Sequence, residues 1–135
     1  MRILKITLII TICCLFGCCN RQDQADAQRA AERVNSLIQK QDYVSIYKES
    51  GDEFKKGGDQ AKFVAMLEAI DNSAGPVKKF SPIAYQSSLD TSVGRKHVLI
   101  YELQFEGGRG RERLEFTRDR NGEMRLWDLV IEPIQ

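Results

Sequence analysis

Several residue types that commonly build functional sites are scarce in this sequence. Its 135 residues include one histidine, one tryptophan and three prolines, and no cysteine follows position 19. A disulfide framework is therefore excluded, because nothing in the folded part could be cross-linked. A lone histidine with no motif around it gives no support to a Ser-His-Asp catalytic site.

An excess of charge of one sign is also missing. The chain has 20 basic and 19 acidic residues, and without Arg2 and Lys5 at its N-terminus 18 basic residues remain. Such a balance produces no overall field that would attract nucleic acid, so we expect no nucleic-acid partner. The hydrophobic content of 42% excludes a largely disordered chain, and the length fits one domain with its own core.

The longest apolar run is too short to cross a membrane as a helix. It covers residues 6–17, "ITLIITICCLFG", and follows the basic start "MRILK". A spanning helix needs about twenty such residues, whereas a secretory signal has a shorter apolar centre after a positive start. The polar stretch "NRQDQADAQ" comes next. We therefore predict a signal peptide over residues 1–17.

All four cysteines lie at the end of this segment, in "ICCLFGCCN". Adjacent cysteines with no histidine nearby do not suit a tetrahedral metal centre, so we predict no metal site. Leu15-Phe16-Gly17-Cys18 instead resembles a bacterial lipobox, which implies that a diacylglyceryl group is attached to Cys18. Two alternatives stay open: lipid attachment at Cys19, and an uncleaved signal anchor. Residues 18–24 would form the lipidated start and a short tether, and residues 25–135 a single domain.

Three helices are predicted in the first half of this domain. Apolar residues recur at helical spacing over residues 25–40 and 60–74. Asp42 and Asp59 are suitable N-caps for a short second helix and for the third. Gly75-Pro76 would end the third helix, and the glycine-containing segment 50–59 is expected to be a loop.

Four strands are predicted in the second half, over residues 77–88, 95–106, 111–119 and 123–133. The second has the clearest alternation, and Asn121-Gly122 is a strong hairpin signal. Pro82 indicates that the first strand is at an edge or is bulged. Trp127 is expected on the apolar face of the last strand, in line with Leu129.

Short connections make these strands antiparallel neighbours, so the fold class is α+β, with three N-terminal helices on a curved four-stranded sheet. This order, with "QKQDYVSIYKES", "KFVAMLEAIDNSAG", "VLIYELQFEG" and "RERLEFTRDRNGEMRLWDLVI", resembles small bacterial lipoproteins with a nuclear-transport-factor-two-like, or cystatin-like, domain of unknown function. The resemblance covers about residues 25–133. It implies a cone-like domain and no assigned activity or cofactor.

No group of residues has the context of a catalytic site, so we assign no catalytic residue and no cofactor. The aromatic residues that we place at a candidate ligand pocket in the cone are Tyr43, Tyr47, Tyr101 and Trp127. Each has core packing as its alternative. His97 is expected to be a polar strand-end residue that is exposed or hydrogen-bonded, with a general base or a ligand-binding residue as the alternative.

We expect a lipid-anchored protein of the bacterial cell envelope, facing the periplasm or the exterior, that binds a protein partner or a small apolar ligand without catalysis. The first alternative is a small enzyme, which predicts an open pocket with a buried carboxylate of shifted pKa near a tyrosine. A partner-binding module instead predicts an exposed apolar patch around Val98 and Ile100, and self-association as a homodimer through that face is a third reading. The arginine-rich segment 107–113, "GGRGRER", is expected to be a solvated hairpin, with contact to anionic headgroups as its alternative.

Substitution of the predicted lipid acceptor tests the lipobox. Cys18→Ala is expected to release the protein from the membrane fraction, because acyl chains provide the durable part of membrane attachment. Fractionation followed by immunoblotting measures this. If Cys19→Ala releases the protein and Cys18→Ala does not, the predicted position of the lipid is wrong.

Overall fold

The computed structural model describes the backbone of residues 4–134 and the side chains of residues 21–134. Cys18 and the predicted signal peptide lie outside the described side chains. The elements in chain order are α1 (Leu4–Gln39), α2 (Tyr43–Glu49), α3 (Asp52–Lys56), α4 (Gln60–Ala74), β1 (Val77–Asp90), β2 (Gly94–Phe105), β3 (Gly108–Arg118) and β4 (Met124–Ile134). In these residues no helix is long and apolar enough to cross a membrane.

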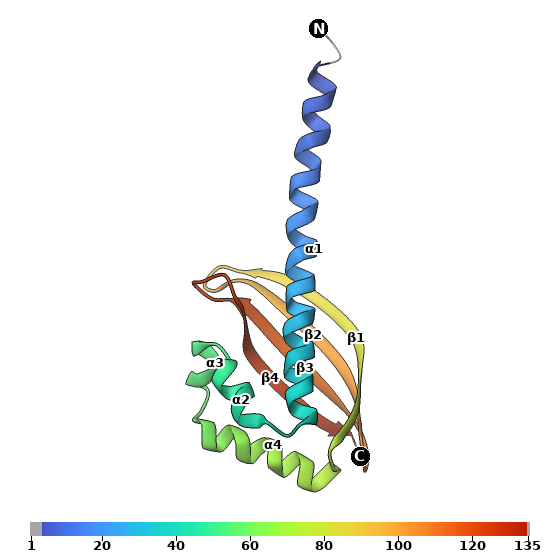
Figure 1. Ribbon diagram of the computed structural model, residues 1–135, viewed down its shortest axis with the longest axis vertical. Helices are drawn as coiled ribbons and strands as arrows, with labels where there is room; N and C mark the ends of the chain where they lie inside the picture. The colour runs from blue at the N-terminus through green and yellow to red at the C-terminus, as the bar shows by residue number, and fades with distance from the viewer. Residues whose placement is uncertain (1–3, 135) are drawn as a thin grey trace.

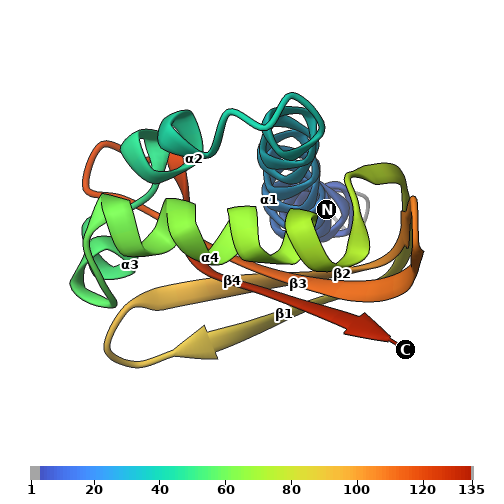
Figure 2. The same ribbon diagram turned by 90° about the horizontal axis from the view of Figure 1, so that it is seen from below.

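The predicted α+β class and the antiparallel sheet are confirmed. The strands pair in the order β1-β2-β3-β4, each antiparallel to its neighbour (Figure 1). Figure 2 shows the helices on one side of this sheet. β1 is an edge strand with an irregularity between Pro82 and Ala84, as the proline indicated. The sheet therefore has one covered face and one open face.

The described part of the chain has four helices where three were predicted. The additional helix is α3, in the segment expected to be a loop. Its acidic residues lie in the first turn and its lysines in the last turn, which suits the helix dipole. Phe54 fixes this short helix by packing edge-on against Phe63, with ring centroids 5.2 Å apart.

The predicted N-caps of α2 and α4 and the predicted end of α4 are confirmed. The side chains of Asp42 and Asp59 accept hydrogen bonds from the backbone N–H groups of Ser45 and Lys62, at 3.2 and 2.8 Å. Gly75 ends α4 with a φ of 79°, a conformation that favours glycine. These local signals determine where α2 and α4 begin and where α4 ends.

One hydrophobic core lies between the helices and the covered face of the sheet. α1 contributes a stripe in which Ala27 and Ala31 are completely buried, and these small side chains let the helix approach the strands closely. The buried apolar residues are Ala27, Ala31, Val34, Leu37, Ile38, Tyr43, Ile46, Phe63, Leu67, Val77, Leu99, Tyr101, Leu103, Phe105, Leu114, Phe116, Leu126 and Leu129.

Trp127 does not lie in this core, contrary to the sequence-based expectation. The register between β3 and β4 shifts at Glu115/Phe116, so that Asp128 pairs with Glu115 but Leu126 pairs with Phe116. The extra residue in β4 is Trp127, which is only partly buried. A bulge changes which side of a strand its residues face, and Leu126 takes the core position instead.

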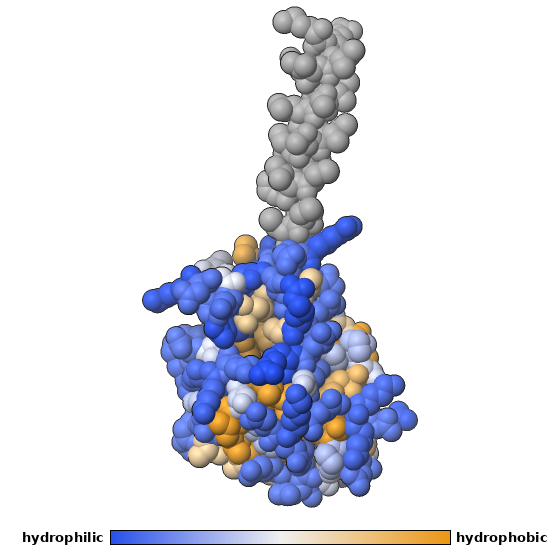
Figure 3. Space-filling view, in the orientation of Figure 1, coloured by the Kyte–Doolittle hydropathy of each residue, from blue (hydrophilic) through white to orange (hydrophobic). Residues whose placement is uncertain are grey.

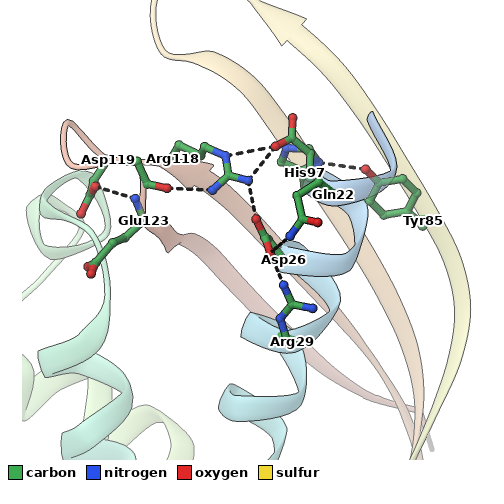
Figure 4. A network of polar contacts seen from close by, with 10 residues as sticks. Gln22, Asp26, Arg29, Tyr85, His97, Arg118, Asp119 and Glu123 are labelled. Carbon is green, nitrogen blue, oxygen red and sulfur yellow. Dashed lines mark hydrogen bonds and ion pairs between the residues drawn. The ribbon is translucent and has the colours of Figure 1, made fainter. Parts of the chain in front are cut away.

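Polar contacts join the start of the described part of α1 to the end of β3 (Figure 4). Arg118 donates to Asp23 at 2.7 and 3.1 Å, to Asp26 at 2.6 Å and to the carbonyl oxygen of Gly122 at 2.7 Å. The hydrogen bond from Arg118 is the main cause that lowers the pKa of Asp26. We call Arg118, Asp23 and Asp26 the Arg118 clasp.

The clasp changes the description of the tether predicted over residues 18–24. α1 runs through this segment as one helix, and Asp23 is held against β3. Residues separated by 95 positions in the chain are thereby joined at one end of the sheet. The described side chains therefore contact the sheet within a few residues of residue 21.

Removal of the clasp should loosen the beginning of α1 while the core stays intact. Arg118→Met is expected to speed amide hydrogen exchange over residues 21–26, because two carboxylates lose their shared cation, and to leave exchange around Ile38 unchanged. Arg111→Met is the control, since Arg111 is exposed on the same strand. Equal exchange at residues 21–26 in both variants would contradict this role of Arg118.

Candidate functional site

A cleft with a volume of about 760 Å³ lies between α1 and β1. We call it the α1–β1 cleft. α1 supplies a polar wall of Gln28, Glu32, Asn35, Ser36 and Gln39. The sheet supplies the other wall, with Phe80, Pro82, Ile83, Ala84, Tyr85, Leu99 and Tyr101 beside Lys78 and Lys79. A ligand in the cleft would therefore meet amide and carboxylate groups on one side and a largely apolar surface on the other.

Asn35 gives the cleft a buried polar group that lacks a partner. Its side chain is 7% exposed, and Oδ1 forms no hydrogen bond in the described part of the chain. A buried acceptor without a donor is unfavourable, and such atoms usually bind water or a ligand. Tyr101, which lines the cleft and is also nearly buried, has its pKa raised by burial and by the nearby Glu112 and Glu32 carboxylates.

Glu112 lies on β3 directly opposite Tyr101 in the sheet register. Opposite residues on antiparallel strands have their Cβ atoms about 5 Å apart. Glu112 is completely buried, and neither carboxyl oxygen has a hydrogen-bond partner in the described residues. Burial raises the pKa of this carboxyl to about 8. Glu112 is therefore a neutral acid at pH 7.

His97 is held in place by packing. It is 1% exposed, its Nδ1 is 2.9 Å from the hydroxyl oxygen of Tyr85, and the two rings stack with centroids 6.1 Å apart. Burial lowers the pKa of His97, which favours the neutral imidazole. This agrees with the expected hydrogen-bonded polar residue at a strand end. Tyr85 also lines the cleft, so the pair fixes part of its wall.

The four aromatic residues predicted at one pocket are not brought together. Tyr101 lines the α1–β1 cleft, whereas Tyr47 and Trp127 line a second pocket of about 390 Å³ beside α3 and α4. Tyr43 lines neither pocket, and its hydroxyl group donates a hydrogen bond to the carboxylate of Asp71. Burial, followed by Asp71, raises the pKa of Tyr43.

The second pocket is built around an aromatic cluster. The rings of Tyr47, Phe54 and Phe63 lie with centroids 5.2 to 6.2 Å apart. Tyr47 also donates to the carbonyl oxygen of Gly58 at 3.0 Å. Its polar group is thus already satisfied. The charged residues Glu53, Lys62 and Asp128 also line this pocket.

The open face of the sheet does not carry the apolar patch that a partner-binding face would show. Val98 and Ile100 are partly buried, and Arg113 lies beside them with Glu115 and, at 3.8 Å, Asp128 as ion partners. Among the described side chains, the large exposed hydrophobic residues are Met66, Ile83, Leu89 and Ile134. Figure 3 shows the opposite, helix-bearing side, where hydrophilic residues predominate and hydrophobic ones form smaller patches.

Sequence reasoning missed Glu112 and Asn35. A signal for Glu112 was present, because it precedes Leu114 by two positions and so faces the same side of β3. Because glutamate is charged, the sequence pattern indicated a residue that faces solvent. Within the described residues no group of three or more potential ligands fits a metal ion.

Comparisons with known proteins add no family to this description. No protein-family model matches the chain, and no curated protein matches it.

Ionisation of Glu112 should make stability depend on pH. Between about pH 4.5 and 8 the folded protein keeps the Glu112 proton that the unfolded chain has lost, so this group's contribution to stability falls as pH rises through that window. Glu112→Gln is expected to remove this part of the slope and to exceed the native protein in unfolding free energy above pH 8 by several kcal/mol.

Urea unfolding at pH 5 and pH 9 measures the effect. Glu115→Gln on the same strand is the control, because Glu115 has Arg113 as an ion partner. This variant should keep the native slope. A Glu112→Gln variant whose stability falls with pH as steeply as that of the native protein would show that Glu112 is already ionised in the fold.

Proposed function

We propose that the chain is a lipid-anchored envelope protein whose domain binds a small ligand, without catalysis, in the α1–β1 cleft. The observation that carries the ligand-binding role is the cleft itself, with the unpartnered Oδ1 of Asn35 in its wall. Its volume of about 760 Å³ falls within the range of small-molecule sites, roughly 300–1,000 Å³. The anchor would be a diacylglyceryl group on Cys18, with the domain facing the periplasm or the exterior.

The arrangement of the domain is compatible with the nuclear-transport-factor-two-like cone that the sequence resembles. In such a cone, helices cover one face of a curved sheet, and a ligand site is expected between helices and sheet. The α1–β1 cleft lies between a helix and the sheet. Two observations therefore support the cone: the arrangement of the helices on the sheet, and the residue patterns of the helices and strands.

The ligand chemistry follows from the two walls. Apolar contact with Phe80 and Leu99 favours a hydrophobic body, and the acceptor oxygens of Asn35 and Glu32 favour a hydrogen-bond donor at one end. A small, mainly apolar molecule with a donor group fits both walls. A protein partner has less support, because the open sheet face carries charged side chains around Ile100.

A small enzyme remains the second candidate, on the strength of one observation. Glu112 combines a pKa of about 8 with a position opposite Tyr101, and shifted carboxylates are common in active sites. A general base, however, must come within about 3 Å of the proton that it removes. Glu112 is completely buried and does not line the cleft. Binding is therefore the better-supported function.

Native mass spectrometry of the full-length protein, extracted from its own membranes, tests the proposal. We expect a bound small molecule at one copy per chain. Glu32→Trp should remove it, because the indole would fill the cleft from an exposed position on α1. Lys40→Trp, at the exposed position that directly follows α1 and lies outside the cleft, should retain it.

Circular dichroism establishes that both variants keep the fold. Binding that survives Glu32→Trp would move the ligand site away from the cleft. A native protein with no bound molecule would contradict the ligand-binding role.

A further inference from the structure

The strands divide the domain into two distinct ends. The β1–β2 turn and the β3–β4 turn lie at one end, because Asp90 pairs with Gly94 and Arg118 pairs with Met124. The β2–β3 turn lies at the other end. α1 enters the domain at the first end (Figure 1). There Asp23 contacts Arg118. We call this first end, made by residues 89–95, residues 118–124 and the start of the described part of α1, the anchor-side end.

The Arg118 clasp limits how far this end can be from the lipid. Asp23 follows Cys18 by five positions, and five residues span at most about 18 Å even when fully extended. Arg118 holds Asp23 against the end of β3. If Cys18 carries the lipid, as in the proposed function, the anchor-side end must lie close to the headgroups.

The acidic groups of this end are all engaged by nearby cations. Asp23 and Asp26 bind Arg118, and Asp90 lies 3.5 Å from Lys96. In the β3–β4 turn, Asp119 and Glu123 both pair with Arg125. Negative charge at this end is therefore largely neutralised.

Three arginines at the same end have no such partner. Arg21, Arg95 and Arg120 are exposed, and none forms an ion pair within the described residues. Leu89 pairs with Arg95 in the register and is 74% exposed, more than the other large exposed hydrophobic residues of the described chain. An exposed leucine beside one arginine, with two more arginines at the same end, is suited to a surface of anionic headgroups above acyl chains.

Side-chain hydrogen bonds hold both turns of the anchor-side end. The Asp90 carboxylate accepts hydrogen bonds from the backbone of Ser92 and Val93, at 2.8 and 3.3 Å. Asp119 does the same for Asn121 and Glu123, at 2.8 and 3.0 Å. Such Asx-type bonds hold turns in one conformation before any contact is made. Little ordering is then needed when a surface is bound.

From these observations we propose that the anchor-side end is a second membrane contact, which docks on anionic phospholipids. Arg21, Arg95 and Arg120 contact lipid phosphates, and Leu89 enters the interface between headgroups and chains. The inference rests on the proposed lipid anchor and extends it, because it gives the domain a fixed orientation. The arginine-rich segment 107–113 begins at the β2–β3 turn, so its first arginines lie at the far end.

Quenching by brominated phospholipids tests this orientation. The full-length lipidated protein is reconstituted into vesicles of phosphatidylcholine alone or mixed with phosphatidylglycerol. A tryptophan probe replaces either Leu89 or Ile134, an exposed apolar residue of the far end, in a Trp127→Phe background. We expect severalfold stronger quenching of Leu89→Trp than of Ile134→Trp in the anionic vesicles.

The arginines should be required for this difference. Combining Arg95→Gln and Arg120→Gln is expected to reduce quenching of Leu89→Trp to its value in phosphatidylcholine. Quenching of Leu89→Trp that does not exceed that of Ile134→Trp, or that is equal in both vesicle types, would overturn the proposal. The intact mass of the same sample reports the lipid separately, so a missing anchor contradicts the proposed function and is distinguished from a domain that carries the lipid but does not dock.

Discussion

The packing of α1 across the covered face of the sheet is the interaction on which the rest of the structure depends. Ala27 and Ala31 are completely buried there, so the helix lies close to the sheet. The edge strand β1 stays partly uncovered, and the α1–β1 cleft remains beside it. The same helix contributes Asp23 and Asp26 to the Arg118 clasp at the anchor-side end. One element thus sets the core, the cleft and the connection to the N-terminal segment.

The buried polar groups make this packing less stable than an apolar equivalent would be. Glu112 and Asn35 place three unpartnered oxygen atoms in or beside the core. Each lost hydrogen bond costs about 1–3 kcal/mol, and apolar residues of similar shape would avoid that cost. Unpartnered buried polar groups are expected near a binding site, whereas a domain with a purely structural role gains nothing from them. The position of Asn35 in the wall connects this cost with ligand binding.

Local signals allowed much of the fold to be predicted, but the site depends on features that have no local signal. Alternating patterns and caps placed α4 and the four strands correctly, because each depends on nearby residues. Trp127 was placed wrongly because a bulge changes the facing of residues without altering the local pattern. Glu112 was overlooked because the strand pattern does not show which charged residue is completely buried in the folded chain. Three of the predicted ligand aromatics lie at two different pockets and Tyr43 lines neither, because residue type gives no information about which elements enclose a cavity.

We propose that α1 and the Arg118 clasp hold the domain directly on the membrane, with the α1–β1 cleft beside the helix. Neutron reflectometry of the lipidated protein on a supported anionic bilayer measures the spacing between protein and headgroups. The account predicts a protein layer that begins at the headgroups with no separate water layer. A hydrated gap wider than about 18 Å, the longest span available between Cys18 and Asp23, would contradict it.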